Sequence, residues 1–185
     1  MTIDSKEASA ALSEIGEIVR RVRQSRIYDL ASQIMIAAGA LVVAGNLTNF
    51  VFQRHGAYIW IAVNVLNVVA AAIIAMRGAR TSGIQPFDYR VFAAFALFYA
   101  FGLLCCNVLG HYGPREQGTF WAVYFMLFYC IAGLWFGRAF IAIGLAITAL
   151  TLIGYAFIGG ASFLLWMALV NGGGLILSGF WMRWS

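Results

Sequence analysis

Long runs of apolar residues, separated by short charged segments, make up most of the chain after Asp29. Stretches without Asp, Glu, Lys or Arg cover residues 30–53 (24 residues), 56–76 (21), 91–110 (20), 117–137 (21) and 139–182 (44). A helix needs about 20 apolar residues to cross the roughly 30 Å hydrocarbon core of a bilayer. Four of these runs therefore fit one crossing each, and the last run is long enough for two.

The last run divides at Gly159 and Gly160, since glycine accepts the backbone conformations of a tight turn. The pattern thus predicts six transmembrane helices, near residues 30–53, 57–77, 91–111, 119–137, 139–158 and 161–182. The segment "IAVNVLNVVAAAIIAM" is apolar on every side, whereas a transmembrane β-strand alternates apolar and polar residues. The expected fold class is all-α, a polytopic helix bundle in which residues 29–185 form one transmembrane domain.

Residues 1–28 precede the first run and have a different pattern. Apolar side chains recur there at helical spacing, at Ala8, Ala11, Leu12, Ile15, Ile18, Val19 and Val22. This spacing predicts an amphipathic leader helix over residues 5–26, acidic at its start and basic at its end. The leader either anchors at the membrane surface, where anionic headgroups attract each Arg by about 1 kcal/mol, or docks a protein partner. Docking would use Leu12, Ile15, Val19, Arg20, Arg21 and Arg23.

Basic residues are concentrated in the segments that six crossings place on one side of the membrane. Ten of the 12 basic residues fall on that side, and only Arg54 and Arg115 fall on the other. By the positive-inside rule, both ends of the chain are expected in the cytoplasm. The arginines lie in short segments where they orient helices, so the net charge of +5 does not call for a nucleic-acid partner.

The composition, 63% hydrophobic and 10% charged, is that of a protein whose main partner is the lipid bilayer. Soluble domains are nearer 25% charged. No predicted span carries an acid, Lys or Arg deep inside it, which counts against ion-coupled transport and against intramembrane hydrolysis. We therefore expect a non-enzymatic protein without a cofactor.

Asparagines are the notable polar residues of the spans. Asn46, Asn49, Asn64 and Asn107 fall in the outer half of the predicted spans, and Asn67 shares a helix face with Asn64. One interpretation is hydrogen bonding between helices, about 0.6 kcal/mol per contact; the other is a neutral ligand-binding pocket that opens outward. Pairs of small residues four apart predict close helix packing: Ala40 with Ala44, Ala71 with Ala75, Ala142 with Ala146, and Gly174 with Ser178.

Three further groups suggest chemistry. The aromatic stripes of the third and fourth spans are typical of lipid-facing or core surface, or of a groove for a flat apolar ligand such as a quinone. His55, His111 and Glu116 fall in or near outer loops and could form a metal or redox site, although ordinary surface roles are favoured. Cys105, Cys106 and Cys130 lie within spans, and the differing depths of Cys105 and Cys130 do not predict a disulfide.

The layout of a short leader, six compact spans, "GLWFGR" (133–138) and a closing "GGGLILSGFWMR" (172–183) resembles a known group of proteins. These are small bacterial inner-membrane proteins often encoded beside winged-helix transcriptional regulators. The resemblance implies an inner-membrane location and association with a regulatory system. The expected function is sensory, regulatory or complex-scaffolding, with a cytoplasmic or membrane partner. The alternatives are a homo-oligomeric transporter or channel for a neutral solute, and a cofactor-binding redox subunit.

Overall fold

The computed structural model of the protein describes residues 5–82, 89–110 and 112–184, and these residues contain helices and short connections but no strand. Five helical segments are long and apolar enough to cross a membrane: Ser25–Val51, Gln53–Gly78, Pro114–Phe136, Arg138–Phe157 and Ser162–Trp184. The predicted third span yields a shorter apolar helix, Ala93–Val108. The expected all-α bundle of membrane-spanning type is thus confirmed for this part of the chain.

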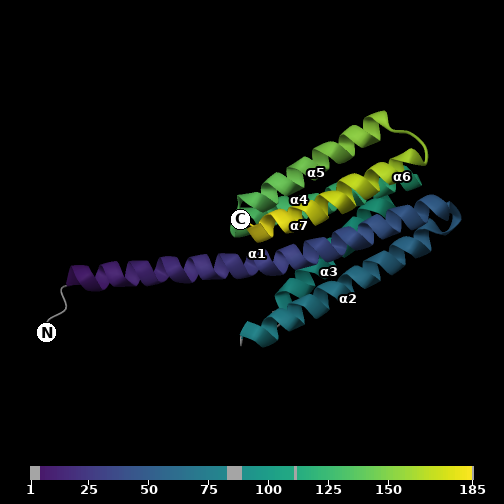
Figure 1. The fold of residues 1–185 in the computed structure, drawn as a ribbon. Coiled ribbons are helices and arrows are strands. Elements are labelled where there is room, and N and C mark those ends of the chain that lie inside the picture. Colours follow the sequence, from purple (N-terminus) through teal and green to yellow (C-terminus); the bar gives the residue numbers. More distant parts are fainter. Residues whose placement is uncertain (1–4, 83–88, 111, 185) are drawn as a thin grey trace.

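Figure 1 shows the order of the elements. They are α1 (Ser5–Val51), the 3-10 turn η1 (Gln53–His55), α2 (Gly56–Ser82), α3 (Tyr89–Leu104), the π-helical turn η2 (Cys105–Leu109), α4 (Pro114–Phe136), α5 (Arg138–Phe157), α6 (Ser162–Met167), the π-helical turn η3 (Ala168–Gly173) and α7 (Gly174–Trp184). Helices α6 and α7 with η3 between them form one continuous last helix. We call the end of the bundle that carries η1 and the turn after α5 the distal end.

Helix α1 joins the predicted leader and the predicted first span without a break. No Gly or Pro occurs between Gly16 and Gly39, so nothing in the local sequence ends the helix where the charge pattern changes. At 1.5 Å per residue its 47 residues extend about 70 Å, more than twice the thickness of a hydrocarbon core. The N-terminal part of α1 consequently projects beyond the bundle (Figure 1).

The backbones of α1 and the last helix touch along a seam of glycines. A Cβ atom on Gly172 would lie 2.4 Å from Cγ2 of Val43 and 2.9 Å from the carbonyl oxygen of Gly39. One on Gly179 would lie 2.8 Å from the carbonyl oxygen of Ser32. Membrane helices associate through such close approach, since burial from lipid gives little driving force.

Two of the alanine pairs that the sequence singled out do not make these contacts. Ala40 and Ala44 of α1 are exposed on the bundle surface, and so are Ala142 and Ala146 of α5. The glycine seam uses the neighbouring face of α1 instead. The prediction of packing through these alanines was wrong, because the same small-residue spacing occurs on more than one face of each helix.

A second seam joins α4 and α5, which are linked by the single residue Gly137 with φ of 137°. A Cβ atom on Gly144 would lie 2.9 Å from the carbonyl oxygen of Met126. The hydrophobic core lies between this hairpin, α1 and the last helix, with Met35, Met126, Phe140, Ile143, Ile147, Val170, Leu175 and Met182.

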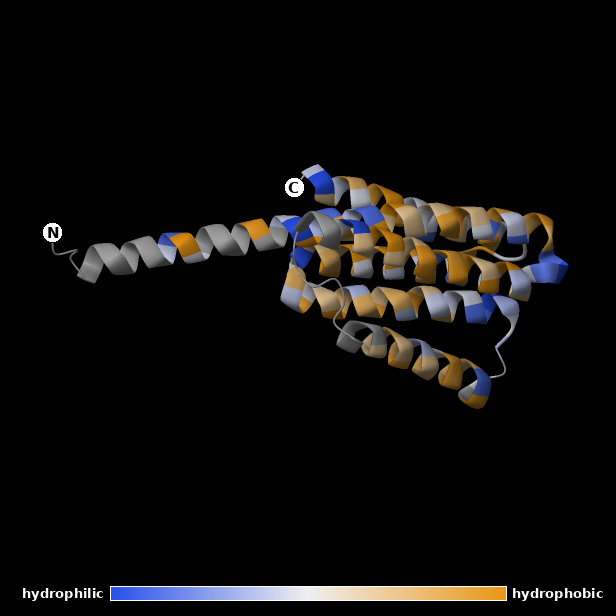
Figure 2. Cartoon of the chain, turned by 90° about the horizontal axis from the view of Figure 1, so that it is seen from below, coloured by the Kyte–Doolittle hydropathy of each residue, from blue (hydrophilic) through white to orange (hydrophobic). Residues whose placement is uncertain are grey.

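Helices α2 and α3 lie at the edge of the bundle (Figure 2). Helix α2 packs on α1, where Val63 approaches Gly45, and its other face exposes large apolar side chains. Helix α3 meets α4 through stacked rings rather than backbone contact: the centroids of Phe98 and Tyr124 are 4.1 Å apart. In a bilayer, the exposed apolar faces of both helices would contact lipid.

Candidate functional site

Three of the five asparagines that the sequence proposed for a ligand pocket make hydrogen bonds within the helices. Asn46 is buried and donates to the carbonyl oxygen of Val42 at 2.9 Å. Asn107 donates to the carbonyl oxygen of Leu103 at 2.8 Å.

Asn64 links two helices. Its Nδ2 donates to the carbonyl oxygen of Trp60 at 2.8 Å, and its Oδ1 accepts a hydrogen bond from the hydroxyl of Tyr99. This pair joins α2 to α3, and it corresponds to the interhelical role that the sequence offered for the asparagines.

The other two asparagines are Asn49 and Asn67. Asn49 lies at the corner between α1 and α2, with Oδ1 2.8 Å from the position of a Cβ on Gly56. Asn67 is partly buried on α2, and its side chain makes no hydrogen bond to another residue that the structure describes. Neither cavity reported below is lined by any of the five asparagines, so the outward polar pocket stays a prediction.

A buried polar pair lies elsewhere in the bundle. Asn171 of η3 donates to Oγ1 of Thr151 on α5 at 3.2 Å and lies 3.3 Å from Sδ of Met167. Both Asn171 and Thr151 are buried. A π-helical turn inside an α-helix is frequent at functional sites. The sequence signal for this pair was weak: an asparagine followed by three glycines, which also fits close packing.

Arg115 secures the distal end. From the first turn of α4 its Nη2 donates to the carbonyl oxygens of Tyr155 and Ile158, at the C-terminus of α5. Its Cζ lies 4.8 Å and 5.0 Å from the ring centroids of Tyr155 and Phe163. The carbonyls at a helix C-terminus lack intrahelical partners and carry partial negative charge, so a guanidinium stabilises them.

A groove of about 380 Å³ lies beside Arg115, between α4 and α5. It is lined by Tyr112, Glu116, Thr119, Phe120, Val123, Tyr124, Leu127, Leu152 and Tyr155. Rings stack along one wall: the centroids of Tyr112 and Phe120 are 6.0 Å apart, and those of Phe120 and Tyr124 are 5.3 Å apart. The aromatic stripe of α4 therefore packs partly on α3 and partly along this groove.

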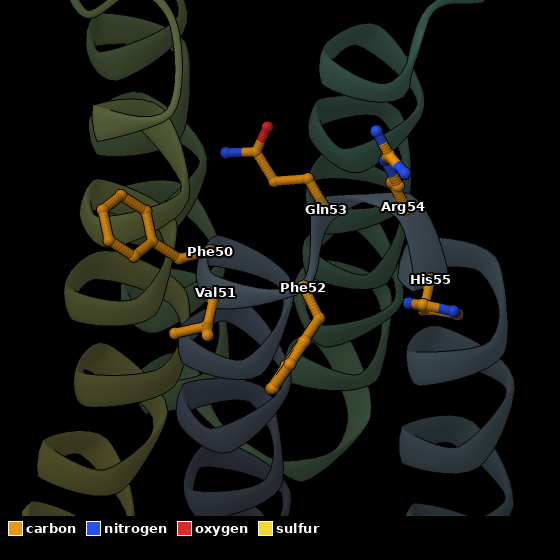
Figure 3. Close-up of a pocket in the computed structure, with 6 residues that line it drawn as sticks. All are labelled: Phe50, Val51, Phe52, Gln53, Arg54 and His55. Carbon is orange, nitrogen blue, oxygen red and sulfur yellow. The ribbon is translucent and has the colours of Figure 1, made fainter.

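A second hollow, of about 400 Å³, lies at the corner between α1 and α2. Six consecutive residues line it, Phe50 to His55, and Figure 3 shows their side chains splaying in different directions. All six are exposed. This hollow is an open surface of one short connection, without groups that converge on a ligand.

The metal or redox hypothesis depends on a residue that the structure does not describe. His55 is exposed in η1 and Glu116 lies in the first turn of α4, while His111 lies outside the described residues. Among the described residues, no group of three His, Cys, Asp or Glu side chains could hold a metal ion. The three cysteines are free thiols.

The docking residues of the leader lie on the helical part of α1 that projects from the bundle. Ile15 is 57% exposed, and Val22, one heptad later, is 49% exposed. The backbone of Leu12, Val19, Arg20, Arg21 and Arg23 is helical, and their side chains lie outside the described part of the structure.

Comparisons with known proteins give no family for this chain: no family model, curated protein or solved structure matches it.

Proposed function

We propose that the chain is a non-enzymatic inner-membrane protein with a regulatory or complex-scaffolding role, in which α1 presents a docking surface to a cytoplasmic or membrane protein. The observation that carries this proposal is the continuity of α1. One helix runs from Ser5 to Val51, and its span is fixed to the last helix by backbone contact at Gly39 and Gly172. Such a helix holds its N-terminal part away from the bundle rather than along the membrane surface.

The exposed stripe of the leader is the proposed docking face. Ile15 and Val22 remain exposed because no other described element reaches that part of α1. An amphipathic helix lays its apolar face into a groove of a partner through anchors spaced by three, four and seven residues. The arginines after Val19 would then contribute electrostatic steering toward an acidic partner surface or anionic headgroups.

The proposal includes six crossings with both ends of the chain in the cytoplasm. Helix α3 with η2 would supply the sixth, shorter crossing, because the helices alternate in direction along the bundle (Figure 1). Arg183, near the end of the last helix, lies 3.7 Å from Asp29, at the start of the first apolar run. This contact between the start of the first apolar run and the end of the last helix supports an even number of crossings.

Photo-crosslinking tests the docking role. A benzoylphenylalanine placed at Ile15 in native membranes is expected to capture one protein reproducibly. The matched control is the same probe at Ser13, which is also exposed but lies about 200° around the helix. Equal capture of the same protein from both positions, or capture of lipid and of other copies alone, would contradict a specific docking face.

A second candidate, a small homo-oligomeric transporter or channel for a neutral solute, is favoured by one observation. Asn67 is a polar side chain without a described hydrogen-bond partner on α2, the least buried of the long helices. A pathway shared between copies would explain both features. Flux of a neutral solute into proteoliposomes that Asn67→Leu abolishes would support it; no flux with the unaltered chain would exclude it.

A further inference from the structure

The groove between α4 and α5 has an acidic end and an apolar floor. Glu116 lies at the distal end, one turn before Phe120, and Leu127 and Leu152 lie on the opposite part of the lining. Both leucines are 49% exposed, so the groove opens on the lateral surface of the bundle, where lipid would surround it. A volume of about 380 Å³ lies within the range of sites for small molecules.

Among the groove residues that the structure describes, Glu116 is the only charged one and has no counter-charge. No cationic group of the described residues lies within 4.0 Å of its carboxylate, although Arg115 precedes it in the chain. The guanidinium of Arg115 is directed instead at the C-terminal carbonyls of α5. The carboxylate folds back toward Gly113, where Oε2 would be 2.5 Å from an added Cβ. The positive end of the α4 dipole stabilises a carboxylate in this first turn.

We infer that this groove binds an amphiphilic organic cation, with its ammonium group at Glu116 and its hydrocarbon chain along Leu127 and Leu152. Charge complementarity selects the cation, since a carboxylate beside an apolar groove attracts a partner of opposite charge more strongly than in bulk water. The apolar floor favours a ligand with a hydrocarbon chain. The hydroxyl of Thr119 donates to the carbonyl oxygen of Arg115, so its oxygen is left as an acceptor toward an ammonium N–H.

This site is independent of the proposed docking role of α1, because it lies on α4 and α5 at the distal end. It also differs from the neutral ligand that the asparagines suggested, because the acid favours a positive charge. The same chemistry has two sources: a free alkylamine, or the ethanolamine headgroup of a membrane lipid.

Binding of radiolabelled decylammonium to the full chain in phosphatidylcholine nanodiscs tests the site, with empty nanodiscs as background. Saturable binding is expected, and Glu116→Gln should weaken it about tenfold or more while leaving the binding of decanol unchanged. If Glu116 only stabilised the start of α4, Glu116→Gln would weaken the binding of both decylammonium and decanol, or of neither. Glu14→Gln, which removes an exposed acid from the leader, is the matched control and should bind like the unaltered chain.

The groove-filling variants Leu127→Trp and Leu152→Trp should lower binding of both decylammonium and decanol. Both positions are half exposed, so a larger side chain does not disturb the core. Competition by phosphatidylethanolamine in the nanodisc would identify the lipid headgroup as the source, and lack of competition a free amine. No saturable decylammonium binding, or equal binding by Glu116→Gln, overturns the inference.

Discussion

Gly172 and Gly173 are adjacent in the chain but face different surroundings. A Cβ on Gly172 would meet the backbone nitrogen of Val43 at 2.8 Å, whereas the nearest atom to a Cβ on Gly173 is Cδ1 of Leu169 at 3.9 Å. Gly172→Ala should therefore destabilise the bundle by about 1–3 kcal/mol, the usual cost of overpacking. Gly173→Ala should leave stability unchanged or raise it slightly, since Ala favours helix. Unfolding in sodium dodecyl sulfate measures both, and equal losses would contradict a backbone seam.

Arg115 ties the start of α4 to the end of α5. Its Nε is buried without a hydrogen-bond partner among the described residues, so the guanidinium is held by its contacts to carbonyls and rings. Arg115→Ala should cost about 2 kcal/mol, as expected for charge-assisted hydrogen bonds. Arg54→Ala, which removes an exposed arginine from the same end, should cost less than about 0.5 kcal/mol. Thermal unfolding in detergent compares the two variants. An Arg115→Ala variant as stable as the unaltered chain would contradict a stabilising role of Arg115.

The candidate site shows what sequence patterns give at the scale of residues. The role of Asn64 between helices was one of two interpretations available beforehand, and the structure supplies its partner, Tyr99. The sequence pattern connects Glu116 only with His55 and His111, as part of a possible metal site. Its place in a groove depends on Leu152 and Tyr155, which come more than 30 positions later and which no local pattern connects to it.

At the scale of elements, α1 decides between an anchor and a docking arm. Spin labels at Ser13 and Thr48, in a chain without its native cysteines, lie 35 residues apart on one helix. A straight helix predicts a narrow distance distribution near about 52 Å. A leader lying flat on the membrane would bend away from the span and give a shorter, broader distribution. Ser25→Pro interrupts the helix between the labels, so this variant should give the shorter and broader distance distribution.

Charge-free runs located the elements well, because the cost of burying charge in lipid sets where a span ends. They located the ends of helices less well. The leader and first span are one helix because hydrogen bonding propagates through polar and apolar residues alike. In the third predicted span, α3 ends at Leu104 and continues only as the π-helical turn η2, a change that hydropathy does not register.

The whole molecule is predicted to have both ends of its chain on the cytoplasmic side. Green fluorescent protein fused after Ser185 should fluoresce, and alkaline phosphatase fused after His55 should be active. This follows from the contact between Asp29 and Arg183 together with the excess of basic residues at that end. A non-fluorescent C-terminal fusion with an active phosphatase fused there would indicate five crossings instead of six.

The seam between α1 and the last helix has a consequence for how the protein is made. Gly39 meets Gly172, 133 positions later, so α1 leaves the ribosome well before the last helix, against which it packs. At about 5–20 residues per second, that interval is on the order of ten seconds. During this interval α2 already packs on α1 at Gly45. The face of α1 that carries Gly39 still contacts only lipid or the insertion machinery. Synthesis interrupted before Ser162 would leave α1 to α5 in the membrane with the glycine face of α1 uncovered, a form suited to recognition by membrane proteases.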